Sequence, residues 1–191
     1  MSYSLPFAVL WCVWFAAWFG AGIFASRPEK RPRLSREARY WAVTAAGGVL
    51  LYLNFRTTGG LQVQWTVAGA LEWALLVVAA IGLGFTWWAR VHLGVLWSGN
   101  VTRKPGHRVV ETGPYGLVRH PIYTGILLAV YATALLRPGW YGLAGCVVMT
   151  LGFIDKIRLE EAFLGEILGS EYAAYRARVP MLVPFLPKRA G

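Results

Sequence analysis

A cluster of turn-forming, aromatic and cationic residues lies between Thr112 and Gly125, immediately before a long apolar stretch. Pro121 suits the first position of a helix, where its missing N–H costs nothing, so Arg119 and His120 lie at the helix start. The free N–H groups and the positive end of the helix dipole face the same region as these two cationic side chains. The pattern predicts an anion-attracting site. The alternative is a helix start whose Arg, His and Tyr side chains only anchor the chain at a membrane interface.

Two adjacent carboxylates, Glu160 and Glu161, form a second cluster nearer the C-terminus. At about 100° per residue, segment 155–175 is predicted to be an amphipathic helix, and both glutamates fall on its apolar arc. Buried carboxylates are costly unless they are paired or hydrogen-bonded, so we expect a cation or a donor to meet them. The candidates are Arg119, His120, His107 and a cationic ligand. The alternative is that the helix turns both acids toward the wet membrane interface.

The elements that carry these clusters are strongly apolar, because 57% of the 191 residues are hydrophobic. This composition indicates an integral membrane protein, and we expect an all-α, polytopic helix bundle of about five spans. The predicted spans cover residues 5–25, 40–55, 67–89, 122–136 and 140–154. The last two are joined by a tight breaker at 137–139 and form a hairpin that either crosses the bilayer or re-enters it. A cytoplasmic loop and the C-terminal helix are expected to cover the site.

The formal charge of +10 is concentrated in two short loops, 26–39 and 90–120, whereas the N-terminus and the loop 57–66 carry almost none. This asymmetry predicts an external N-terminus and a cytoplasmic C-terminus and active site. The expected location is the bacterial inner membrane. The basic loops would lie against anionic lipid headgroups, which argues against a nucleic-acid partner. The first span lacks the basic start of a secretory signal, so we expect it to be retained.

The chain is predicted to form one domain over residues 1–191, with membrane scaffold spans at 1–89 and a cofactor-binding catalytic half at 90–191. The three histidines are irregularly spaced, and Cys12 and Cys146 lie in separate apolar segments without metal-ligand spacing. We therefore expect no metal site. A zwitterionic cofactor suits the two clusters: its carboxylate would meet Arg119 and the helix start, and its ammonium or sulfonium would meet glutamates and aromatic faces.

The second half of the chain resembles the isoprenylcysteine carboxyl methyltransferase family and its phospholipid N-methyltransferase relatives. The motifs that carry the resemblance are Leu93-Gly94 with Trp97-Ser98, Gly106-His107-Arg108-Val109-Val110, Gly113-Pro114-Tyr115, Arg119-His120-Pro121-Ile122-Tyr123 with Gly125, Glu160-Glu161, and Gly169-Ser170-Glu171-Tyr172 with Tyr175. The resemblance implies an S-adenosylmethionine cofactor. The cofactor-binding residues that it implies are His107, Val110, Gly113, Tyr115, His120, Pro121, Tyr123 and Glu160.

The implied activity is S-adenosylmethionine-dependent methyl transfer to a lipophilic, membrane-partitioned acceptor, with Arg119 and Glu161 as catalytic residues. The sequence leaves open whether the acceptor is a carboxylate, which Arg119 would orient, or an amine, from which Glu161 or a tyrosine would help remove a proton. Two alternatives are an NADPH-dependent, sterol-reductase-like membrane enzyme, which shares an Arg-His-Pro-x-Tyr segment, and a non-enzymatic membrane scaffold. The paired glutamates and the short chain favour the methyltransferase.

Overall fold

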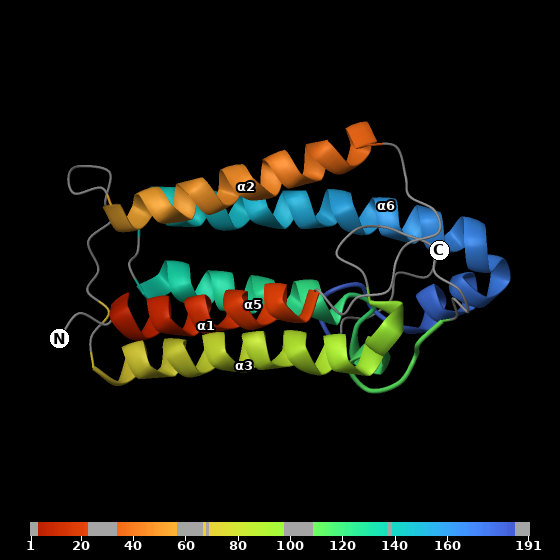
Figure 1. Cartoon of the computed structure of the whole chain (residues 1–191), viewed down its shortest axis with the longest axis horizontal. Helices are drawn as coiled ribbons and strands as arrows, with labels where there is room; N and C mark the ends of the chain where they lie inside the picture. Colours follow the sequence, from red (N-terminus) through yellow and green to blue (C-terminus); the bar gives the residue numbers. More distant parts are fainter. Residues whose placement is uncertain are drawn as a thin grey trace.

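The computed structural model of the chain describes residues 4–22, 34–56, 67, 69–97, 109–136 and 139–185. Within these ranges all regular structure is helical, which confirms the predicted all-α class. Figure 1 shows long helices lying roughly along one common axis, with the short helix α4 and the last part of α6 gathered at one end.

Among the residues that the structure describes, five long helices correspond in sequence to the five predicted spans. Their bounds are α1 Ser4–Gly22, α2 Leu34–Arg56, α3 Ala70–Leu93, α5 Pro121–Leu136 and α6 Trp140–Arg178. Two short turns of helix, η1 Gly94–Leu96 and α4 Pro114–Leu117, lie between α3 and α5. The helix α6 is longer than expected, because the predicted fifth span continues into the predicted tail helix, with a kink at Gly169.

Two of these helices, α1 over Leu5–Gly22 and α3, are long and apolar enough to cross a membrane, and α5 is a shorter apolar helix. Large apolar side chains also lie on the outside of the bundle, where Phe19 is 70% exposed and Ile81 is 60% exposed. An outer surface of this kind is typical of contact with lipid. The complete five-span topology, the orientation and the membrane crossing of the α5–α6 hairpin stay predictions.

Pairs of facing glycines set how closely the helices approach. A Cβ atom on Gly82 of α3 would lie 2.6 Å from the carbonyl oxygen of Gly125 on α5. A Cβ atom on Gly47 of α2 would lie 2.8 Å from the carbonyl oxygen of Gly145 on α6. Small residues permit such close backbone packing, which supplies dispersion contacts where lipid removes the hydrophobic driving force. The bundle therefore contains two tight pairs, α2 with α6 and α3 with α5.

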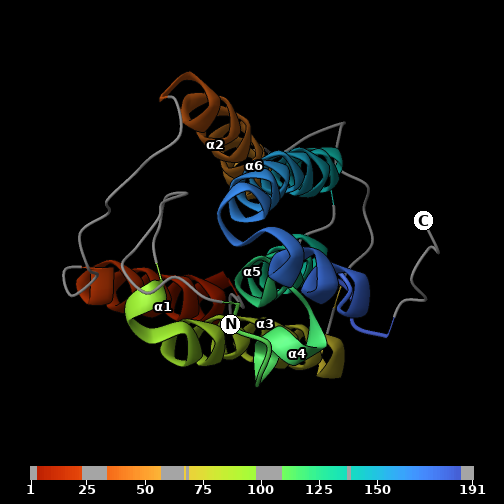
Figure 2. The same ribbon diagram turned by 90° about the vertical axis from the view of Figure 1, so that its right-hand side faces the viewer.

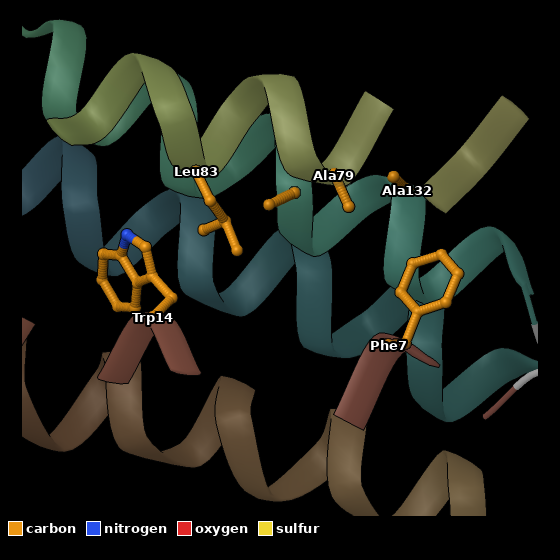
Figure 3. Close-up of a cluster of buried hydrophobic side chains, with 6 residues drawn as sticks. Phe7, Trp14, Ala79, Leu83 and Ala132 are labelled. Carbon is orange, nitrogen blue, oxygen red and sulfur yellow. The ribbon is translucent and has the colours of Figure 1, made fainter. Parts of the chain in front are cut away.

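Helix α1 packs against the α3–α5 pair through a compact apolar cluster. Phe7 and Trp14 point from α1 toward Ala79 and Leu83 of α3 and Ala132 of α5 (Figure 3). At the end of the bundle near the site, the guanidinium carbon of Arg90 lies 4.4 Å from the ring centroid of Trp18 and 3.6 Å from that of Trp97. The Arg90 side chain also donates a 2.9 Å hydrogen bond to the Trp18 carbonyl oxygen. These contacts join the end of α1 to the end of α3.

Gly169 allows α6 to turn back toward the start of α5. Its backbone has φ 53° and ψ −124°, a conformation that side-chain-bearing residues rarely adopt. Residues 170–178 continue as helix, and Figure 2 shows this last part of α6 close to α5 and α4. There the hydroxyl of Tyr175 donates a 2.8 Å hydrogen bond to the carbonyl oxygen of Tyr115.

Candidate functional site

The turn before α5 is shaped by glycine and proline. Gly113 has φ 58°, and a Cβ atom there would lie 2.8 Å from the His92 ring, so the turn tolerates no larger residue without rearrangement. Pro114 begins α4 and Pro121 begins α5, as expected of proline at a first helical position. Arg119 and His120 are therefore held at the start of α5, as the sequence predicted.

The backbone of these two residues is paired with the chain that follows α6. The N–H of Arg119 donates to the carbonyl oxygen of Pro180 at 2.8 Å, and the N–H of His120 donates to that of Met181 at 3.1 Å. The Thr124 hydroxyl donates to the Leu182 carbonyl oxygen at 2.7 Å. The C-terminal segment thus lies beside the start of α5 and fixes its position.

The Arg119 guanidinium binds groups within the protein. Its Nε donates to Glu161 Oε1 at 2.8 Å, and its side chain is only 9% exposed. Its Nη1 donates to the carbonyl oxygens of Arg176 and Val179. Arg119 therefore joins α5 to both parts of α6.

His120 lies between the two glutamates. Its Nε2 is 3.1 Å from Glu161 Oε1, and its Nδ1 is 3.6 Å from Glu160 Oε2. The hydroxyl of Tyr123, one turn further along α5, donates to Glu160 Oε1 at 2.5 Å. The prediction that cations and donors would meet the two acids is confirmed for Arg119 and His120. The two cationic side chains at the start of α5, which the sequence predicted would attract an anion, are thus paired with carboxylates of the same chain.

The charges in this cluster stabilise one another. Burial disfavours the charged form of His120, but hydrogen bonds with Glu160 and Glu161 and the charges of both raise its pKa above the ordinary value. Burial also opposes ionisation of Glu161, yet the hydrogen bonds from His120 and Arg119 lower its pKa to about 2. The pKa of Glu160 is lowered too, because His120, Lys156 and Tyr123 outweigh its burial. The favoured state is an imidazolium between two carboxylates.

A cavity of about 550 Å³ adjoins this network. Its polar wall is formed by Arg119, His120, Tyr123, Lys156 and Glu160. Its apolar wall extends to α1 and α2 and comprises Trp11, Trp14, Phe15, Trp18, Phe19, Trp41, Ile122, Ile126, Met149, Phe153 and Phe163, among others. One cavity therefore connects a charged region to side chains of α1, a helix that is long and apolar enough to span a membrane.

Most of the predicted site residues come together on this cavity. Those on its wall are Val110, Tyr115, Arg119, His120, Pro121, Tyr123 and Glu160. Glu161 lies behind the wall, against Arg119 and His120, and Gly113 shapes the turn without lining the cavity. His107 lies outside the described residues.

Lys156 is a wall residue that the sequence reasoning missed. Its side chain is 7% exposed, and its ammonium nitrogen lies 5.1 Å, 5.2 Å and 5.4 Å from the ring centroids of Tyr40, Trp41 and Tyr123. A usable signal was present, because Lys156 precedes Glu160 by four residues and such residues share a helix face. That Tyr40 and Trp41 of α2 lie beside Lys156 could be seen only in the folded structure.

Comparison with known proteins shows which family this part of the chain is similar to. Residues 73–166 match the model of the isoprenylcysteine carboxyl methyltransferase family. This match confirms the family resemblance that was predicted from the sequence, and it includes the turn at Gly113, the start of α5 and both glutamates.

The individual relatives are also named as methyltransferases. The chain is 34% identical over 87 residues to protein-S-isoprenylcysteine O-methyltransferase B of Arabidopsis thaliana, which covers 45% of this chain and 44% of the relative. It is 34% identical over 86 residues to protein-S-isoprenylcysteine O-methyltransferase of Schizosaccharomyces pombe, covering 44% and 36%. It is 38% identical over 76 residues to methanethiol S-methyltransferase of Crocosphaera subtropica, covering 40% and 29%. The matched stretch is less than half of each relative.

Proposed function

We propose that the chain transfers a methyl group from S-adenosylmethionine to a lipophilic acceptor that enters from the bilayer. The observation that carries the proposal is the single cavity that connects Glu160, Tyr123 and His120 to the apolar side chains of α1 and α2. A polar cofactor suits the first region and a hydrocarbon chain suits the second. The family match and the methyltransferase relatives support the same reaction class.

The residues on the wall fit S-adenosylmethionine by their chemistry. Glu160 presents a carboxylate, and Tyr115, Tyr123, Tyr172 and Tyr175 present aromatic groups; both kinds of group attract a sulfonium or an ammonium. The residues proposed to hold the cofactor are His107, Val110, Gly113, Tyr115, His120, Pro121, Tyr123 and Glu160. When bound, S-adenosylmethionine supplies a methyl group on a positively charged sulfur, open to in-line displacement by a nucleophile.

The protein's part is to position charge and to exclude water. His120 and Tyr123 fix the Glu160 carboxylate on the cavity wall, where it faces the cation that the cofactor would bring. Glu161 and Arg119 act behind the wall, because their bond to each other and to His120 keeps the start of α5 against α6. We therefore assign Arg119 and Glu161 to catalysis as positioning residues.

Calorimetric titration of purified protein in detergent or nanodiscs tests the cofactor. S-adenosylmethionine is expected to bind and NADPH is not, and Glu160→Gln is expected to weaken binding about tenfold to a hundredfold, the value of one charged hydrogen bond. Glu166→Gln, at an exposed position of α6, is the matched control and is expected to leave the affinity unchanged. Binding of NADPH alone, or equal affinity in all three proteins, would contradict the proposal.

A transfer assay with acceptors of graded alkyl length tests lateral entry. Each buried methylene is worth about 0.8 kcal/mol, so apparent affinity is expected to rise with chain length until the cavity is filled. A short water-soluble analogue serves as the comparison. Equal turnover of that analogue at equal concentration would indicate an acceptor that arrives from water instead.

A further inference from the structure

The segment 179–185, which follows α6, turns apolar side chains away from the protein. Val183 is 52% exposed and Phe185 is 90% exposed. At the other end of the segment, Val179 is buried against Tyr172 and Tyr175 of α6. The segment is therefore anchored in the protein at its start and presents two large apolar groups at its tip. Neighbouring apolar side chains that stay exposed in this way mark a surface that contacts a partner.

The backbone of the segment is bonded to the first turn of α5. The carbonyl oxygens of residues 180 and 181 accept hydrogen bonds from the N–H groups of Arg119 and His120, and that of Leu182 accepts one from the Thr124 hydroxyl. The acceptors advance along the segment as the donors advance along α5. The segment thus runs beside the helix toward its apolar part.

The face of α5 that holds the segment is itself apolar and exposed. Thr124 shares this face with Leu128, Tyr131 and Leu135, because residues spaced by three or four positions lie on one side of a helix. These three side chains are 39–42% exposed. Val183 and Phe185 therefore extend an outward-facing apolar surface at the end of the bundle nearest the charged cluster.

Positive charge flanks the apolar tip. Residues 172–191 include no acidic residue and four basic ones, which are Arg176, Arg178, Lys188 and Arg189. Arg176 and Arg178 pair with Glu161 and Glu111, yet their side chains stay 62% and 56% exposed. An apolar stretch between basic residues suits the boundary between acyl chains and anionic headgroups. A second copy of this chain, with its net charge of +10, would bring like charges to the same place.

We propose that Val183 and Phe185 insert into an anionic bilayer surface, at the level of the first turns of α5, and that the basic residues on either side bind its headgroups. The segment also accepts hydrogen bonds from the backbone of Arg119 and His120 and, at Val179, from the Arg119 guanidinium. Contact with lipid is therefore expected to hold the start of α5 in place. The inference requires the chain to be embedded in a membrane, but it is independent of the methyl-transfer function.

Fluorescence quenching locates the tip of the segment. Cys12 and Cys146 are replaced by alanine, a bimane probe is attached to Val183→Cys, and the protein is placed in nanodiscs of phosphatidylcholine and phosphatidylglycerol. A lipid spin label near the headgroup end of the acyl chain is expected to remove most of the emission, and aqueous iodide to remove little. A probe at Leu135 is the lipid-facing control, and a probe at Glu166, exposed on α6, is the aqueous control.

Hydrogen exchange tests the coupling to the site. In the same nanodiscs, the amides of Arg119 and His120 are expected to exchange about tenfold faster in Val183→Ser/Phe185→Ser than in wild type, because burial of a large apolar side chain changes an equilibrium by at least this factor. The matched variant Val183→Leu/Phe185→Leu keeps the tip apolar and is expected to exchange within about twofold of wild type. Removal of phosphatidylglycerol is expected to speed exchange in wild type, since the basic residues lose their anionic partner.

Three results would overturn the inference. Quenching of the Val183 probe by iodide and not by lipid would place the tip in water. Shielding of the probe from both quenchers would indicate a protein partner in place of lipid. Equal exchange in the serine and leucine variants would show that the tip does not hold the start of α5. Loss of lipid quenching at Leu135 would refute the membrane embedding itself, whereas the proposed function is tested separately by binding of S-adenosylmethionine.

Discussion

Replacing Glu161 by alanine is expected to destabilise the protein strongly, because it removes the shared counter-ion of two buried cations. The side chains of Arg119 and His120 are 9% and 7% exposed, and both donate to the same Glu161 oxygen. Without it His120 can release its proton, whereas the Arg119 guanidinium is left as a buried cation without its carboxylate partner. Removing one partner of a buried ion pair costs about 3–5 kcal/mol, which is the loss expected for Glu161→Ala. Glu161→Gln keeps an acceptor oxygen and is expected to lose about 1.5–3 kcal/mol.

Thermal unfolding of purified protein in one detergent, followed by tryptophan fluorescence, measures this loss. For a chain of this size 1 kcal/mol corresponds to about 2–4 °C, so the midpoint of Glu161→Ala is expected to fall by roughly 6–20 °C. Glu166→Ala, on an exposed face of the same helix, is the control and is expected to change stability by no more than about 0.5 kcal/mol. If Glu161→Ala and Glu166→Ala unfold at the same temperature, the buried network does not hold α5 against α6 and the reasoning is wrong.

Three further predictions concern pH, helix packing and orientation. Because the pKa of His120 is raised in the folded protein, the stability advantage of wild type over His120→Gln is expected to be complete below about pH 6.5 and to shrink as the pH rises through the raised pKa; an advantage that grows with pH would contradict the imidazolium. Gly82→Ala places a Cβ 2.6 Å from a backbone oxygen of α5 and is expected to cost about 1–3 kcal/mol, whereas Gly84→Ala, with open space around it, should not destabilise; equal thermal midpoints would argue against tight α3–α5 packing. In a chain whose native cysteines are replaced, an impermeant maleimide added from outside is expected to modify a cysteine at Ser4 and not one at Ser35, and the reverse pattern would invert the predicted orientation.

The sequence was informative where a local rule decides the structure. Pro121 predicted the start of α5, and with it the placement of Arg119 and His120, because proline is favoured at a first helical position. The position of Glu160 and Glu161 on an apolar helix arc predicted that cations would meet them, since unpaired buried carboxylates are costly. Both inferences needed only periodicity and the cost of burying charge.

What could not be predicted depends on contacts between distant segments. The conformation of Gly169 sends the end of α6 back over the start of α5, and no pattern around it distinguishes this turn from a helix that simply continues or ends. The backbone hydrogen bonds from Arg119 and His120 to residues 180 and 181 follow from that turn. The approach of Tyr40 and Trp41 to Lys156 likewise depends on the packing of α2 along α6. Such features are set by tertiary structure. The sequence therefore indicated which residues belong to the charged cluster, but it did not indicate the shape of the cavity.

The two glutamates occupy different environments because neighbouring residues on an α-helix point about 100° apart. Glu161, 8% exposed, turns toward Arg119 and His120, whereas Glu160, 19% exposed, turns toward Tyr123 and the cavity. If both acids served only to hold helices together, Glu160 would not need to lie on the cavity wall, because burying a charge there is unfavourable unless neighbouring groups compensate for it. His120 provides part of this compensation, because its Nε2 bonds to Glu161 while its Nδ1 faces Glu160. A rigid, internally paired network therefore keeps one carboxylate ionised at the cavity surface. This arrangement suits a ligand that carries a positive charge.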